Sequence, residues 1–166
     1  MSSTSTSEAL RAIGNDLDLR GIKTFSLKRE ADLFVVDGGY QAPPADTPVT
    51  VHYCRKDIEE LCRKAAESND YLFRTRSFIY RSEILSAIGT YVEDKGGRLV
   101  SISNLRSTEP APIIDITYDV LVSGQIIERF TEVDIYALCV RGHKRRQRRE
   151  ASRDIRFTRF SSLSCE

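Results

Sequence analysis

The sequence predicts an α+β fold in which one αβββα unit occurs twice, with the two units related by a pseudo-twofold axis. Residues 7–27 and 82–102 are identical at 8 of 21 positions, whereas average residue usage gives about one or two matches by chance. A second match follows in the same order, because the pattern Asp-Ile-x-x-Leu-Cys at residues 57–62 recurs at 134–139. Such an internal duplication predicts architecture and leaves the chemistry open.

The first element of each unit is an amphipathic helix. Ser7 and Ser82 are expected as N-caps, and Gly21 and Gly96 stand where glycines end helices. The apolar side chains recur at i, i+3 and i+7, which places them on one helical face. They are Leu10, Ile13 and Leu17 in the first unit and Leu85, Ile88 and Val92 in the second.

Each of these helices also contains a glycine in its middle. Gly14 and Gly89 are equivalent in the two units, and glycine inside a helix costs about 1 kcal/mol relative to alanine. The same cost in both units suggests a steric reason. We expect close approach of the helix to the sheet or to its counterpart across the pseudo-twofold axis. Retention from an ancestral unit is the alternative.

Three strands follow the first helix in each unit. In the second unit, apolar residues alternate with polar ones from Ile114 to Val122, which is typical of an antiparallel strand with one buried face. We expect the six strands to join in one antiparallel sheet with the helices packed on one face. The expected strands are 23–29, 33–36 and 49–54, then 98–104, 114–122 and 126–130.

A second helix closes each unit, starting near Arg55 and near Glu132. Thr131 and Asp134 have the spacing of a capping box immediately before an apolar stripe. Together, these patterns predict five successive parts of the chain. They are a polar N-terminal tail (1–6), repeat 1 (7–68), a connector (69–81), repeat 2 (82–141) and a basic, flexible C-terminal tail (142–166).

The αβββα order resembles that of the double-stranded RNA-binding domain. Arg55-Lys56 loosely matches the basic pattern that opens the last helix in that family, whereas Glu132-Val133 occupies this place in the second unit. The resemblance covers element order alone, and element order does not carry function.

The composition indicates a soluble globular protein, with 40% hydrophobic and 30% charged residues. The sequence has no membrane-spanning apolar run and no signal peptide, so a cytoplasmic location and no membrane partner are expected. His52 and His143 lack ligand-spaced partners, and the four cysteines are dispersed, so no metal is expected. No phosphate loop, dinucleotide motif or nucleophile motif is present. We therefore expect a non-enzymatic protein without catalytic residues or cofactors.

Charge is distributed unevenly along the chain. Residues 1–140 contain 16 Lys and Arg against 21 Asp and Glu, whereas residues 141–166 contain 9 against 3. Dense basic segments attract phosphate backbones without base specificity. The sequence therefore predicts a contact with DNA or RNA. The candidate binding residues are Arg141, Lys144, Arg145, Arg146, Arg148 and Arg149.

Two other functions are open. The two units together, which we call the body, are suited to a protein-interaction or assembly module. In that case the acidic side chains of the body would contact a protein partner. A small-molecule binder or enzyme would place its site in the cleft between the repeats, but no acid, base or nucleophile set supports it.

Overall fold

The computed structural model describes residues 4–22, 24–40, 47–67, 81–105 and 113–161. Within these residues, the chain has an α+β fold with four helices and six strands, and the order αβββα occurs twice. The first half contains α1 (Thr6–Leu19), β1 (Thr24–Glu30), β2 (Leu33–Gly39), β3 (Pro48–Tyr53) and α2 (Arg55–Glu67). The second half contains α3 (Arg81–Asp94), β4 (Gly97–Leu105), β5 (Ile113–Val120), β6 (Gly124–Phe130) and α4 (Glu132–Ser161).

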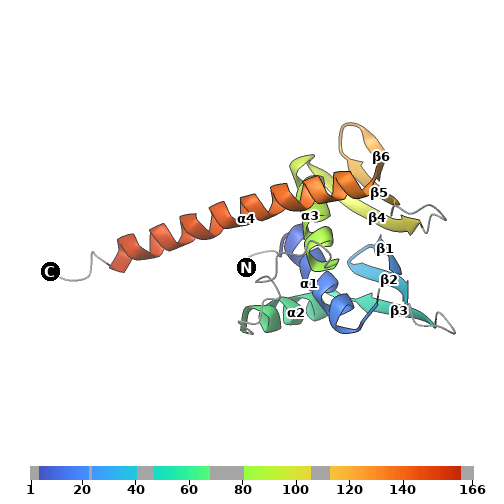
Figure 1. The fold of residues 1–166 in the computed structure, drawn as a ribbon, viewed down its shortest axis with the longest axis horizontal. Helices are drawn as coiled ribbons and strands as arrows, with labels where there is room; N and C mark the ends of the chain where they lie inside the picture. Colours follow the sequence, from blue (N-terminus) through green and yellow to red (C-terminus); the bar gives the residue numbers. More distant parts are fainter. Residues whose placement is uncertain (1–3, 23, 41–46, 68–80, 106–112, 162–166) are drawn as a thin grey trace.

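The six strands form one antiparallel sheet, as the sequence predicted, and their order is β3-β2-β1-β4-β5-β6. The two halves meet at the centre, where β1 pairs with β4 and Leu27 lies opposite Ile102. The four helices lie on one side of the sheet (Figure 1). The strands β3 and β6 form the two edges.

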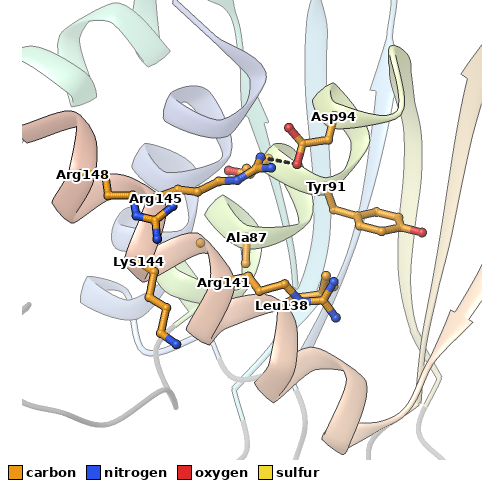
Figure 2. A pocket seen from close by; sticks show the side chains of 10 residues that line it. Ala87, Tyr91, Asp94, Leu138, Arg141, Lys144, Arg145 and Arg148 are labelled. Carbon is orange, nitrogen blue, oxygen red and sulfur yellow. Dashed lines mark hydrogen bonds and ion pairs between the residues drawn. The ribbon is translucent and has the colours of Figure 1, made fainter. Parts of the chain in front are cut away.

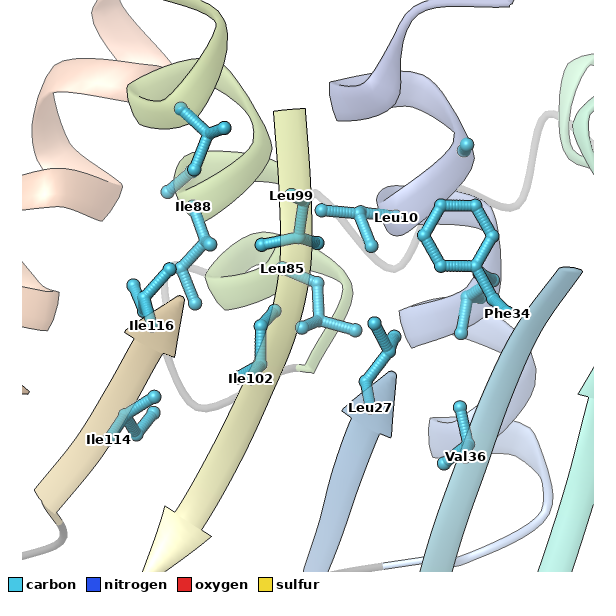
Figure 3. Packing of buried hydrophobic residues seen from close by; sticks show 14 of the residues in the cluster. Leu10, Leu27, Phe34, Val36, Leu85, Ile88, Leu99, Ile102, Ile114 and Ile116 are labelled. Carbon is cyan, nitrogen blue, oxygen red and sulfur yellow. The ribbon is translucent and has the colours of Figure 1, made fainter. Parts of the chain in front are cut away.

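The core lies between the sheet and the first helix of each half. Every residue of the two predicted helical stripes is buried, with at most 1% of its surface exposed. Leu10 and Leu85 point towards Leu27 and Ile102 of the central strands (Figure 3). Burial of a side chain of this size stabilises the fold by about 1.5–3 kcal/mol, so this face fixes how α1 and α3 lie on the sheet.

The helices α1 and α3 pack against each other at their glycines. A Cβ atom added to Gly14 would lie 2.5 Å from the backbone nitrogen of Ser82, and one added to Gly89 would lie 2.7 Å from the Cα atom of Ser7. Real Cβ atoms do not approach backbone so closely. The expectation of close approach to the counterpart helix is confirmed, and it explains why both positions are glycine.

Hydrogen bonds between the ends of α1 and α3 also occur in equivalent pairs, with the roles of the two helices exchanged. The backbone N–H of Ser7 in α1 donates to Oε1 of Glu93 in α3 at 3.2 Å. The backbone N–H of Ser82 in α3 donates to Oδ2 of Asp18 in α1 at 3.4 Å, and that of Arg81 donates to Oδ1 at 3.3 Å. Each carboxylate thus satisfies N–H groups that the first turn of the other helix leaves unpaired. Burial raises the pKa of Asp18, although these hydrogen bonds oppose the shift.

The N-cap prediction for α1 is wrong by two residues. Ser5 is the N-cap, and its side chain forms a capping box with Glu8. The hydroxyl of Ser7 instead donates to the backbone oxygen of Ser86 at 3.0 Å, because Ser7 lies in the contact with α3. The predicted C-terminal glycines are confirmed, since Gly21 and Gly96 have φ angles of 72° and 65°.

The strand β5 is shorter than its apolar alternation predicted. It ends at Val120, and Val122 lies in the following turn with 95% of its surface exposed. The predicted connector lies outside the described residues, except Arg81, which begins α3.

Candidate nucleic-acid interface

The first turns of α4 are anchored to the body. The backbone N–H of Thr131 donates to Oδ2 of Asp134 at 2.9 Å, and the N–H of Asp134 donates to Oγ1 of Thr131 at 3.4 Å. This is the predicted capping box. Beyond it, Ile135, Leu138 and Cys139 are buried against the core, so the direction of α4 is set by packing.

The basic segment is a helical extension of the second half. The sequence placed a boundary at residue 141 with a flexible tail after it, but α4 continues through residue 142 to Ser161. Arginine, lysine and glutamine are good helix formers, and the segment contains no proline to end the helix. In Figure 1, this part of α4 extends well away from the rest of the molecule.

A hollow of about 260 Å³ lies where α4 crosses α3. The two helices approach each other closely here, since a Cβ added to Gly142 would lie 3.6 Å from Ala87, at ordinary contact distance. This approach determines where the hollow lies. We call this feature the α3–α4 hollow. It is lined by Ala87, Thr90, Tyr91 and Asp94 of α3 and by Leu138, Arg141, Gly142, Lys144, Arg145 and Arg148 of α4.

Positive charge dominates the α3–α4 hollow. Four cationic residues stand at i, i+3, i+4 and i+7 of α4, and this spacing places them on one face of the helix. Among the described residues that line the hollow, Asp94 is the one with an acidic side chain. Figure 2 shows Arg145 reaching across to Asp94, with which it forms an ion pair.

The lining of the hollow keeps a net positive charge although Arg145 and Asp94 form this ion pair. Both side chains are about half exposed, at 51% and 47%, and exposed ion pairs contribute only about 0–1 kcal/mol to stability. An anionic ligand could therefore compete with Asp94 for Arg145 at little cost.

Tyr91 fixes the α3 wall of the hollow. Its hydroxyl donates to Oε2 of Glu128 at 2.7 Å, and the hydroxyl of Tyr118 donates to the same oxygen at 3.0 Å. Its ring also makes an edge-to-face contact with Phe130, with ring centroids 5.4 Å apart. These contacts tie α3 to β5 and β6 beneath the cationic residues.

Alkaline pH is expected to destabilise the fold through two tyrosines. Burial, followed by the hydrogen bond to a carboxylate, raises the pKa of Tyr91 and of Tyr53, whose hydroxyl lies 2.7 Å from Oδ2 of Asp16. Because the unfolded chain loses these protons first, the stabilisation is complete below pH about 10 and declines above it. Urea unfolding across this range should show a shallower decline for Tyr53→Phe and Tyr91→Phe than for the wild type.

The pH range below about 10 provides the control for this experiment. There the two variants should respond to pH as the wild type does, because Tyr53 and Tyr91 remain protonated. An equally steep alkaline decline in Tyr53→Phe and Tyr91→Phe would show that these two protons do not stabilise the fold.

The structure brings together four of the six residues that the sequence predicted. Arg141, Lys144, Arg145 and Arg148 line the α3–α4 hollow. Arg146 and Arg149 belong to α4, but their side chains lie outside what the structure describes. Sequence reasoning missed the contribution of α3, because nothing local marks Asp94 or Tyr91 as partners of a segment about 50 residues later.

A second hollow, of about 220 Å³, lies within the first half. Its lining contains Arg29 and Arg55 but also Asp32 and Glu59, and Arg55 is paired with Glu59 at 2.9 Å. Its charges are balanced, so it is a weaker candidate for an anion. Neither of these two hollows lies between the halves, where the alternative of a small-molecule binder would place its site.

In the described ranges, no group of three or more His, Cys, Asp or Glu side chains could hold a metal ion. Nε2 of His143 lies 2.9 Å from Nε2 of Gln147. His52 lies exposed on the edge strand β3. Asp115 of β5 is held by Nε and Nη2 of Arg129, which lies opposite it in β6, at 2.8 and 3.0 Å.

Among the described helices, none is both long and apolar enough to cross a membrane. No protein-family model matches the chain, and no curated protein or solved structure is significantly similar to it.

Proposed function

We propose that the protein binds nucleic acid without catalysing a reaction, through phosphate contacts made by α4 at the α3–α4 hollow. The alignment of Arg141, Lys144, Arg145 and Arg148 on one helical face carries this proposal. Arginine and lysine are the side chains that most often neutralise phosphates. Contacts of this kind fix position without reading sequence, so the ligand is DNA or RNA of any sequence.

The length of the cationic face fits a phosphate backbone. Seven residues separate Arg141 from Arg148, which corresponds to about 10 Å along a helix axis. Phosphates of one strand in duplex DNA follow each other every 3.4 Å or so along its axis. With one contact for each cationic side chain at most, the face can make about three to four phosphate contacts.

The body acts as a scaffold that holds α4 in place. We infer that it arose by internal duplication and has pseudo-twofold symmetry. The reciprocal bonds from Ser7 to Glu93 and from Ser82 to Asp18 support this inference, because each carboxylate and each serine is 75 residues from its counterpart. Contacts that recur with exchanged partners are typical of an isologous interface. A nucleic-acid ligand also agrees with the cytoplasmic location expected from the sequence.

Binding is expected to weaken steeply with salt. Each phosphate contact with duplex DNA contributes about −0.9 to the slope of log K against log salt concentration. With three to four contacts, the slope of log K against log salt concentration should be about −3. Fluorescence anisotropy with labelled duplex DNA, single-stranded DNA and RNA at several salt concentrations measures it.

Two results would contradict the proposal. One is the absence of binding to any of the three ligands at low salt. The other is binding that does not respond to salt, which would indicate an apolar contact. The alternative function, a protein-interaction module, predicts the first result.

A further inference from the structure

The helix α4 exposes a second face that is apolar. Val133 and Tyr136 have 76% and 55% of their surface exposed, and Val140 is partly exposed. With Ala137, they stand at i, i+3, i+4 and i+7, the spacing of one helical face. This face, which we call the apolar stripe, is opposite to the face that packs on the core.

The equivalent face of α2 is charged. The residues 77 positions before Val133, Tyr136 and Val140 are Lys56, Glu59 and Arg63, and all three are exposed. An exposed helix face is ordinarily polar, as it is in α2. The exposed apolar face of α4 therefore indicates an interaction surface.

We propose that the apolar stripe packs against the apolar stripe of a second copy of this chain, with the two α4 helices antiparallel. The charges at the ends of the stripe favour this occupant. Glu132 and Asp134 lie at its N-terminal end, and Arg141 and Lys144 lie at its C-terminal end. In an antiparallel pair, the acidic end of each helix meets the basic end of the other.

A parallel pair would bring the basic segments of both copies together, and like charges at close range repel. The antiparallel arrangement also ends at two copies, because both copies use the same surface around a twofold axis. It directs the two basic extensions away from each other. The dimer does not depend on nucleic acid, so its test is independent of the test of the proposed function.

The contact is short, since the apolar stripe spans only two turns of helix. Stable interfaces bury about 1,200–2,000 Å², which two turns cannot provide. A weak dimer is therefore expected, with a monomer fraction that decreases as the protein concentration rises.

Sedimentation equilibrium of the full chain, without nucleic acid, tests the proposal. The test variant combines Val133→Lys, Tyr136→Glu and Val140→Arg, which introduces the residues that α2 has at these positions. The control variant combines Leu121→Ser and Val122→Ser, because these two apolar side chains are exposed in a turn elsewhere. Circular dichroism checks that both variants are folded.

The wild type and the control should show the same monomer–dimer equilibrium, and the triple variant should dimerise at least about tenfold more weakly. Glu132→Lys should also weaken the dimer, because it places a cation opposite the basic end of the other copy. A wild type that is monomeric at every concentration would overturn the proposal. A dimer that the triple variant leaves unchanged would overturn it equally.

Discussion

Replacing Gly14 with alanine is expected to destabilise the fold by about 2–3 kcal/mol. The new Cβ would lie 2.5 Å from the backbone nitrogen of Ser82, 2.6 Å from its Cα and 2.7 Å from the carbonyl carbon of Arg81. All three atoms belong to backbone, so no side chain can rotate away. The helices α1 and α3 must therefore separate, although alanine is the better helix former.

Gly89→Ala should act in the same direction with a smaller effect. Its Cβ would meet the Cα and backbone nitrogen of Ser7 at 2.7 and 3.0 Å, and its third neighbour is the side chain of Leu10 at 3.2 Å. The overlap with backbone is therefore less severe than at Gly14. Urea unfolding gives the change in free energy for each variant.

Gly142→Ala is the matched control for these two variants. Its Cβ would lie 3.6 Å from the nearest atoms, those of Ala87, so the gain of up to about 1 kcal/mol in helix propensity should remain. If Gly14→Ala were as stable as Gly142→Ala, the close packing of α1 on α3 would be wrong.

The largest expected effect on binding comes from the α3–α4 hollow. A variant with Gln in place of Arg141, Lys144, Arg145 and Arg148 should bind duplex DNA roughly a hundredfold or more weakly near 0.15 M salt. Glutamine keeps the helix propensity and much of the side-chain length but removes the charge. Three to four lost phosphate contacts should also reduce the salt dependence to near zero.

The helix α2 offers a control of equal charge. Arg55, Lys56, Arg63 and Lys64 are four cationic residues on the helix that occupies the same place in the first half. Gln at these four positions changes the net charge of the protein by the same amount. If both variants lose affinity equally, overall charge and not the α3–α4 hollow determines binding.

The repeat in the sequence was sufficient to predict most of the fold. Apolar residues such as Leu10 and Leu85 recur at helical spacing in both halves, and burial of both stripes requires a common sheet. The pair Gly14 and Gly89 was informative because a shared penalty within a helix needs a shared contact. The sequence did not predict the strand order, in which β1 pairs with β4 at the centre of the sheet.

Long-range contacts account for what the sequence did not predict. Ser7 has the residue type and position of an N-cap, but its hydroxyl bonds to Ser86, 79 positions away. Val122 continues an alternation that the turn at Leu121 interrupts. Such departures depend on neighbours that local spacing does not specify.

The sequence indicated the basic residues of the candidate site but not the helix that carries them. A run of arginines indicates phosphate contact whether it is a tail or a helix, since counterion release depends on charge. The hollow depends on the close approach of α4 to Ala87 of α3, a long-range contact that local spacing does not specify.

An NMR titration of the isotope-labelled chain with a short DNA duplex at low salt tests most directly whether the α3–α4 hollow binds phosphate. We expect amide shifts to change around Ala87, Thr90 and Gly142, which line the α3–α4 hollow, and we expect the changes to disappear at high salt. Changes confined to α2 or to the exposed face of the sheet would contradict binding at the hollow, as would a spectrum that the duplex leaves unchanged.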